Sequence, residues 1–253
     1  MQRYFIPKEN WQDNQVIITD DDYHHVVNVM RKQEGNQIIC CNPNGQAFYC
    51  EINSINEKQV VCNVLEELEE NNELPIHVTI AHGLPKGDKL DLIVQKSTEL
   101  GMGDFVPLQM DRSIVKWDHK KEQKKLLRLK KIAKEASEQS HRSRIPAIQG
   151  KQTIHTLLQN QEFDMCLVAS EYLTKDQSSQ SSFRQAIDKI SPGQKILLII
   201  GPEGGLSEEE LSFLHEQGCL PIRLGARILR TETAPLYALS ALSFYFEEWR
   251  CEV

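Results

Sequence analysis

The most constraining feature of the chain is a continuous apolar run that stops at a glycine-rich loop. The run Ile196–Ile200 has no polar side chain, which is typical of a strand buried on both faces of a parallel sheet. The loop Gly201–Gly205 follows, and Ser207 with Glu210 three residues later has the spacing of a capping box that begins a helix. In open α/β sheets, ligands bind where a strand ends and a helix begins. We therefore expect a ligand-binding loop after residue 200.

The rest of the C-terminal part has the alternating pattern of an α/β domain with a mainly parallel sheet. Strands are predicted at Ile76–Ala81, Phe105–Gln109, Phe163–Ala169, Lys195–Ile200 and Leu220–Leu224. Helices are predicted at Asp88–Leu100, Lys121–Ser140, Ser182–Ile190, Ser207–Gln217 and Ala234–Trp249.

The N-terminal part has a different pattern, made of short β segments and one helix, which favours a small β-barrel. Strands are predicted at Tyr4–Ile6, Val16–Thr19, Gln37–Cys41, Ala47–Ile52 and Gln59–Leu65, and a helix at Asp21–Arg31. The acidic segment Glu66–Pro75 ends in proline and is typical of a boundary between domains. We therefore expect two domains, residues 1–70 and residues 71–253.

Cysteine and apolar residues exclude several classes of protein. The seven cysteines are odd in number and show no CxxC or Cys/His zinc spacing, so we expect reduced thiols and no metal site. No apolar run reaches the roughly 20 residues of a membrane span, and the N-terminus has no signal-peptide core. These observations predict a cytoplasmic protein with no membrane contact.

Charge is distributed unevenly along the chain. The formal net charge is -7, which by itself argues against a generic nucleic-acid binder. Residues 112–151 nevertheless carry 13 Lys/Arg against 4 Asp/Glu, so a basic segment lies within an acidic chain. Such a segment can attract a polyanion, although a solvated helix face explains the same pattern.

A second loop, Leu224–Ala234, follows the last predicted strand. Gly225 permits a tight bend, and Ile228 and Leu229 are apolar residues in a loop, where burial requires a packed neighbour or a ligand. Thr231 or Thr233 can cap the following helix. An ordinary β–α connection is the alternative interpretation.

The two loops together carry a resemblance to a known family. GPEGGLSEEE followed by LGARILRTETAP is similar to the two C-terminal signatures of the RsmE family, SPOUT-class methyltransferases that act on N3 of a uridine in 16S ribosomal RNA. Further matching segments occur in the same order along essentially the whole chain. They are Arg3 with Phe5, His24–His25, Val29–Arg31, Pro85–Lys89, Leu92–Gly101, Asp111–Ser113, Glu138–Ser140, Arg142 and Pro146. His141 inside the Glu138–Arg142 stretch is a small departure from the family pattern.

The resemblance implies a fold, a cofactor and partners. It implies an N-terminal PUA-like β-barrel that assists RNA binding and a C-terminal SPOUT domain with a deep trefoil knot, which physical rules alone would not suggest. It also implies S-adenosyl-L-methionine as cofactor, a homodimer, and 16S rRNA within the 30S subunit as substrate. The cofactor-binding residues that it implies are Ile200, Gly201, Pro202, Glu203, Gly204, Gly205, Leu224, Gly225, Ile228, Leu229, Thr233 and Ala234.

Uridine N3 carries a proton at neutral pH, so its methylation requires a base or cations that stabilise charge developing on the ring oxygens. Arg230 and Arg142 are the cationic candidates, and Glu232 is a candidate base that could instead stabilise a helix N-terminus. The predicted RNA-binding residues are Arg3, His25, Arg31, Lys86, Lys89, Arg112, Arg142 and Arg144.

Three other functions remain open at this stage. A ribose 2′-O-methyltransferase of the same class would share the cofactor but differ in the second signature. An RNA-binding assembly factor without catalysis would not need intact glycines in both loops. An α/β enzyme acting on a small acidic metabolite could use the basic segment as a clamp.

Overall fold

The computed structural model describes residues 1–169 and 181–249, and its contacts divide the chain into two compact units. Unit 1 comprises Met1–Glu73 and Ser137–Ile145, and unit 2 comprises Leu74–Ala136 and Pro146 onwards. The last residues of the long helix α3 (His119–Gln139) therefore belong to unit 1, which a division at a single point in the sequence does not anticipate.

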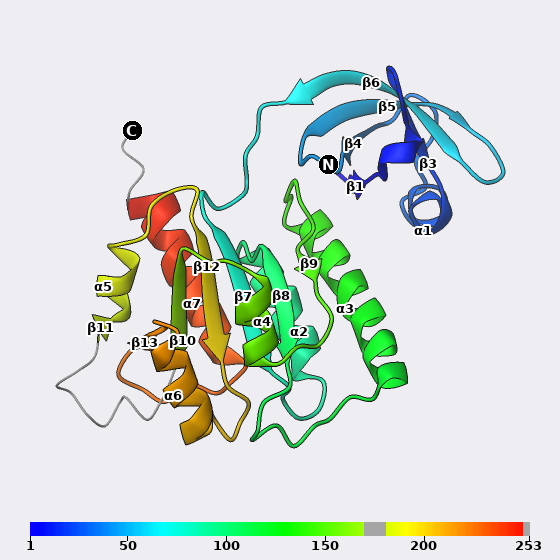
Figure 1. Ribbon diagram of the computed structural model, residues 1–253. Coiled ribbons are helices and arrows are strands. Elements are labelled where there is room, and N and C mark those ends of the chain that lie inside the picture. The colour runs from blue at the N-terminus through cyan, green and yellow to red at the C-terminus, as the bar shows by residue number, and fades with distance from the viewer. Residues whose placement is uncertain (170–180, 250–253) are drawn as a thin grey trace. The chain divides into compact units, whose positions relative to one another are not determined.

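Unit 1 is built around a curled, mixed six-stranded sheet in the order β1-β4-β5-β6-β3-β2 (Figure 1). The strands are β1 (Arg3–Phe5), β2 (Trp11–Gln12), β3 (Gln15–Ile18), β4 (Gln37–Cys41), β5 (Ala47–Ile55) and β6 (Val60–Leu68). The pair β1–β4 is parallel and the other pairs are antiparallel. Apolar residues that alternate along the strands, among them Ile38, Cys40, Ile52 and Cys62, form the core on one face of the sheet.

The helical segments of unit 1 are short. They are η1 (Lys8–Asn10), α1 (Asp20–His24) and the π-helical η2 (His25–Val29). The sequence predicted one helix over Asp21–Arg31, and the structure instead changes from α to π geometry at His25 and ends with Arg31 at a φ of 51°. Sequence patterns give no signal for a π-helix, because its apolar spacing over five residues resembles that of an α-helix.

Unit 2 is an α/β fold around a seven-stranded parallel sheet in the order β11-β13-β10-β12-β7-β8-β9. The strands are β7 (His77–Gly83), β8 (Asp104–Leu108), β9 (Ala147–Ile148), β10 (Met165–Ala169), β11 (Ser181–Ser182), β12 (Lys195–Ile200) and β13 (Leu220–Arg223). The helices are α2 (Lys89–Glu99), α3, α4 (Ile154–Asn160), α5 (Phe183–Ile187), α6 (Glu208–Glu216), α7 (Thr233–Ser243) and the π-helical η4 (Phe244–Trp249).

Helices cover both faces of this sheet, as the apolar run predicts. Ile196, Leu198 and Ile200 of β12 pack into the core that includes residues of α2, α3, α5 and α7. Leu197 and Ile199 pack on the other face, in the core that includes residues of α4 and α6. Figure 1 shows these two helices on one face of the sheet. Because successive side chains of a strand alternate between faces, a central strand buried on both must be apolar throughout.

The five predicted strands and five predicted helices of unit 2 are present, with differences at their ends. The largest difference is in the helix predicted at Ala234–Trp249, which changes from α to π geometry after Ser243. The sequence pattern did not predict α4, β9 or β11, which are too short to show a clear period. In the part of the chain that the structure describes, no helix is long and apolar enough to cross a membrane, and no group of side chains could hold a metal ion. The six described cysteines are free thiols, and Cys251 lies outside the described residues.

Candidate functional site

Unit 2 contains a cavity of about 410 Å³ where β12, β13 and β10 end. The segments around it come from four parts of the sequence: Lys89, the end of β10, the loop after β12 and the loop after β13. Its lining is Lys89, Ala169, Ile200–Glu203, Gly205, Leu206, Ile222–Gly225, Arg227–Glu232 and Ala234. The volume lies within the range of small-molecule sites, and its position at the carboxyl ends of parallel strands is the usual ligand position in such sheets.

The glycine loop begins the helix as predicted. The Ser207 side chain accepts a hydrogen bond from the Glu210 amide at 3.1 Å, and the Glu210 carboxylate accepts one from the Ser207 amide at 2.8 Å. At Gly201 an added Cβ would lie 3.0 Å from the Gly205 backbone. Gly83, at the end of β7, is tighter still, because a Cβ there would lie 2.5 Å from Cδ of Pro202. Glycine is therefore needed at both positions for this close packing of the loop.

A neighbouring loop fixes the outer side of the glycine loop. The Ser207 hydroxyl donates to the Asp111 carboxylate at 2.6 Å, and the Asp111 amide donates to Glu210 at 3.0 Å. Arg112 donates from Nη1 to the Gly204 carbonyl oxygen at 3.1 Å. Arg112, which the sequence predicted as an RNA contact, thus packs on the loop that forms the cavity.

Thr231 connects the two cavity loops to the end of β7. Its hydroxyl donates to the Gly201 carbonyl oxygen at 2.6 Å, and its own carbonyl oxygen lies 3.1 Å from Nε2 of His82. The other ring nitrogen of His82 lies 2.7 Å from the Gly83 carbonyl oxygen. Burial lowers the pKa of His82 more than its contacts with the two carbonyl oxygens raise it.

Lys89 contacts both acidic residues of the cavity. Its Nζ lies 2.9 Å from the Glu203 carboxylate and 3.0 Å from the Glu232 carboxylate. Glu203 also accepts from the Lys86 backbone amide at 3.1 Å. One cation from the start of α2 therefore holds together side chains from the two cavity loops, which are far apart in the sequence.

These contacts set the charge state of all three groups. Burial alone would raise the pKa of Glu203, but hydrogen bonds from Lys89 and from backbone amides outweigh burial and lower it. Burial would raise the pKa of Glu232 as well, and its own backbone amide and Lys89 lower it instead. Hydrogen bonds to the two carboxylates raise the pKa of Lys89. Each group is therefore charged at neutral pH.

The loop Leu224–Ala234 leaves three side chains exposed at the cavity, those of Arg227, Ile228 and Arg230. Ile228 is 71% exposed, so its apolar surface at the cavity is uncovered. Arg230 is also exposed, and among the described residues its side chain makes no hydrogen bond or ion pair. Arg227 is likewise exposed and, among the described residues, makes no side-chain hydrogen bond or ion pair, so the cavity presents two exposed guanidinium groups and one uncovered apolar side chain to a bound molecule.

The structure brings most of the predicted cofactor residues together. All of them line the cavity except Gly204 and Thr233, and the predicted catalytic residues Arg230 and Glu232 line it as well. Sequence analysis missed Thr231 and His82 as connecting residues, and it assigned Lys89 to RNA rather than to the cavity. The partners of Lys89 are more than 110 positions away in the chain, so no local pattern could reveal them.

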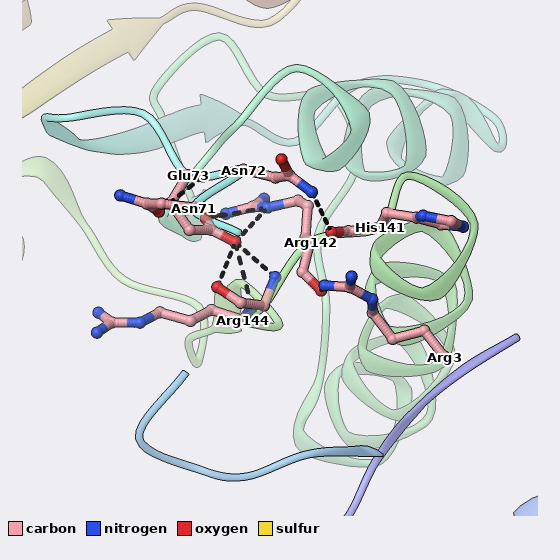
Figure 2. Close-up of polar contacts among 8 residues, drawn as sticks. Arg3, Asn71, Asn72, Glu73, His141, Arg142 and Arg144 are labelled. Carbon is pink, nitrogen blue, oxygen red and sulfur yellow. Dashed lines mark hydrogen bonds and ion pairs between the residues drawn. The ribbon is translucent and has the colours of Figure 1, made fainter. Parts of the chain in front are cut away.

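Two of the predicted RNA contacts in unit 1 are buried. Arg3 is 1% exposed, and donates to the Arg142 carbonyl oxygen at 3.2 Å and to Glu70 at 3.3 Å. Arg142 is 4% exposed and its guanidinium pairs with the Glu73 carboxylate (Figure 2). Both buried arginines contact other residues of unit 1, so in this structure neither guanidinium is exposed for an RNA contact, and the catalytic role of Arg142 stays a prediction.

The other predicted RNA residues differ in how accessible they are. His25 is half-buried, and its Nδ1 lies 3.0 Å from the Tyr4 hydroxyl, so it packs within unit 1. Arg31 and Arg144 of unit 1 are exposed, as is Lys86 of unit 2. The exposed cations of the predicted set therefore come from both units.

Most of the chain matches two family models and is similar to known proteins. Residues 72–243 match the model of a family described as an RNA methyltransferase domain, and residues 18–65 match an RNA methyltransferase PUA domain. The chain is 50% identical to ribosomal RNA small subunit methyltransferase E of Bacillus subtilis, over 98% of each chain. It is 30% identical to the protein of that name from Synechocystis, over 97% of this chain and 78% of the relative.

A solved structure is also similar over nearly the whole chain. The crystal structure of ribosomal RNA small subunit methyltransferase E from Neisseria gonorrhoeae bound to S-adenosyl methionine has a TM-score of 0.83 and 28% sequence identity. The similarity covers 97% of this chain and 98% of the other.

Proposed function

The chain belongs to the RNA methyltransferase family that includes ribosomal RNA small subunit methyltransferase E, and from this premise we propose that it methylates 16S ribosomal RNA with S-adenosylmethionine. The observation that carries the proposal is the cavity of unit 2, which two glycine-containing loops enclose at the carboxyl ends of parallel strands. We further propose N3 of a uridine as the methylated atom, because the second loop, LGARILRTETAP, resembles the second signature of the RsmE family, which methylates that atom.

The residues of the cavity fit this cofactor. Ile200, Leu224 and Leu229 supply apolar walls for an adenine ring, and the backbone around Gly201–Gly205 supplies polar groups for its edge. The ionised Glu203 can accept hydrogen bonds from a ribose hydroxyl or an ammonium group. When bound, the cofactor supplies an electrophilic methyl group on a sulfonium.

Arg230 is the proposed catalytic cation. As N3 gains the methyl group it loses a proton, and negative charge develops on the neighbouring ring oxygens. The free guanidinium of Arg230 at the cavity is suited to stabilise this charge, and a preorganised donor of this kind contributes about 2.7–4 kcal/mol to a transition state.

Glu232 is a poor candidate for the general base. Its pKa lies below the ordinary value, so the carboxylate holds a proton weakly, and Lys89 already occupies it. His82 is buried completely and faces backbone carbonyls. We therefore propose that stabilisation of charge by Arg230, with proton loss to solvent, carries the reaction.

We assign the two parts of the chain to separate tasks. Residues 1–70 form a PUA-like β-barrel that binds RNA, and residues 71–253 form a SPOUT domain with a deep trefoil knot. The curled sheet and the PUA match support the first assignment. The convergence of the β12 loop and the Leu224–Ala234 loop on the end of β7 supports the second. The substrate is the 30S subunit in the cytoplasm.

We also propose a homodimer through the exposed face of α7 and η4. Tyr237, Ser240 and Phe244 lie three or four residues apart along the helix and are exposed, and Trp249 is 72% exposed. The three aromatic side chains, Tyr237, Phe244 and Trp249, form an exposed stripe of the kind that a second copy covers.

Two measurements test the function. Calorimetry with S-adenosylmethionine should show binding in the micromolar range, and no binding at tens of micromolar would refute the cofactor assignment. Mass spectrometry of 16S rRNA from cells that lack the protein should show the loss of one 3-methyluridine. The wild-type chain should restore it and Arg230→Ala should not, although this variant still binds the cofactor. A methylated base other than 3-methyluridine would contradict the assigned atom.

A further inference from the structure

Unit 1 has a cavity of its own, about 660 Å³ in volume, and the proposed function gives it no task. It lies between β1, the turn after β4 and the segment after α3, all within unit 1. Its lining residues are Phe5, Ile6, Pro7, Cys41, Asn42, Pro43, Asn44, Ser143, Arg144 and Ile145.

The carboxylate of Glu73, which forms an ion pair with Arg142, fixes the backbone on one side of this cavity. Glu73 accepts the guanidinium of Arg142 and the backbone amides of Ser143 and Arg144, at 3.0 and 3.2 Å for the two amides (Figure 2). The Arg142 and Glu73 side chains are 5% and 17% exposed. The pair fixes the backbone of the segment 142–144, and it leaves no net charge of its own at the cavity.

Arg144 is the cation that this arrangement presents. Its side chain is exposed, and its Nη2 donates only to the Asn44 carbonyl oxygen at 3.3 Å. Among the described residues, no carboxylate side chain forms an ion pair with it. The stem lies across Gly45, where an added Cβ would meet Nε of Arg144 at 2.5 Å. The glycine therefore places the guanidinium beside the cavity with its charge available to a ligand.

The rest of the lining is apolar or hydrogen-bonding. Phe5 is half-buried, Pro43 is exposed and Ile145 is 37% exposed, so the wall offers flat and aliphatic surface. The Asn44 side chain makes no hydrogen bond within the part of the chain that the structure describes. One cation, an apolar wall and a free amide are the groups that recognise a phosphate, a base face and a base edge.

We infer that this cavity binds one unpaired nucleotide of the substrate RNA, with its phosphate on Arg144 and its base against Phe5, Pro43 and Ile145. The inference rests on the proposed function, since it takes RNA as the ligand. The charge of unit 1 limits the ligand further, because its 82 residues carry 7 Lys/Arg against 14 Asp/Glu. An acidic unit repels a duplex laid across it, whereas a single splayed nucleotide needs only the local cation.

Binding of a labelled 12-nucleotide single-stranded RNA of 16S sequence to the full chain tests the inference. Arg144→Ala should weaken binding roughly tenfold and reduce the slope of log affinity against log salt by about 0.7. Lys58→Ala removes one positive charge from an exposed turn of unit 1 and should stay within twofold of wild type. A duplex of the same sequence should bind weakly to all three proteins.

A second pair of variants moves the guanidinium without removing its charge. Gly45→Ala forces the Arg144 stem aside, whereas Gly35→Ala has the same left-handed strain, φ 82° against 86°, and no atom within 4 Å of the new Cβ. Gly45→Ala should therefore weaken binding several-fold more than Gly35→Ala. Cross-linking of 4-thiouridine RNA should label peptides that contain residues 42–44 or 143–145.

Equal affinities within either matched pair, or cross-links only outside those peptides, would overturn the inference. Inorganic phosphate and a mononucleotide are then compared as competitors of the RNA. If both compete at the same concentration, the proposed role of the base is overturned. An assay of methyl transfer distinguishes failure of this inference from failure of the proposed function. Arg144→Ala should raise KM for RNA with kcat and cofactor affinity unchanged, and a wild-type chain that transfers no methyl group would refute the proposed function instead.

Discussion

The ion pair between Arg142 and Glu73 allows a quantitative test of how unit 1 is held together. Arg142→Met removes the cation and keeps an unbranched apolar side chain of similar length. Glu73 then retains only uncharged partners, which are the backbone amides of Ser143 and Arg144 at 3.0 and 3.2 Å and the Ser143 hydroxyl at 3.5 Å. Its carboxylate stays largely buried, at 17% exposure, with no compensating charge.

The magnitude follows from burial. An exposed ion pair contributes only about 0–1 kcal/mol, whereas removal of one partner from a buried pair costs about 3–5 kcal/mol. The partial exposure of Glu73 places Arg142→Met near the lower end, at about 3 kcal/mol. Adding Glu73→Gln should recover at least about 1 kcal/mol, because the neutral amide oxygen still accepts from both backbone amides and no buried charge remains.

Hydrogen exchange measured by mass spectrometry reports the loss of stability for each peptide of unit 1 separately. A loss of about 3 kcal/mol speeds exchange roughly 100-fold in peptides from residues 1–73 and 137–145, and peptides from β12 in unit 2 serve as the internal control. Exchange in Arg142→Met within threefold of wild type would refute the reasoning. A double variant that exchanges as fast as the single variant would refute it equally, because relief of an uncompensated charge is the stated cause.

Three further predictions concern unit 2. Gly83→Ala places a methyl group 2.5 Å from Pro202 and should abolish measurable cofactor binding in calorimetry, whereas Gly150→Ala, with its nearest neighbour at 3.6 Å, should bind normally. The two carboxylates on Lys89 have lowered pKa values, so their stabilisation is present above pH 4.5 and lost as the pH falls through the folded values. Lys89→Met should have a Tm about 2 °C below that of the wild type at pH 7, and the two Tm values should be equal at pH 3. A difference in Tm that stays constant between pH 7 and pH 3 would contradict this prediction. Phe244→Glu should convert a dimer to a monomer in light scattering, and an unchanged mass would exclude α7 as the interface.

Local patterns in the sequence predicted much of the fold because the physics behind them is local. The alternation of faces along Ile196–Ile200 requires apolar residues when both faces are buried, and the structure confirms that strand. The capping box of Ser207 and Glu210 involves residues three apart, and it is present. The short helix Ile154–Asn160 escaped prediction because seven residues give too few turns for an apolar period.

Sequence analysis identified the cavity loops but not the roles of the charges. Arg3 and Arg142 occupy matching positions in RNA-related motifs, yet their burial gives them structural roles. Arg144, two residues further on, is exposed and carries a free charge. Nothing in the segment 142–144 distinguishes the two arginines, since the partner that selects between them is Glu73, far away in the chain.

By itself the sequence determined the two-part organisation, the parallel sheet, the glycine loop after β12 and the family. These depend on periodicity, on turn residues and on motifs that neighbouring residues complete. Only the tertiary structure decided that Lys89 connects Glu203 with Glu232 and that the end of α3 belongs to unit 1. It also decided that Arg142 is buried whereas Arg144 is exposed. Those features depend on contacts between residues more than 60 positions apart, and the energy of a charged side chain is set by the partners and burial that such contacts provide.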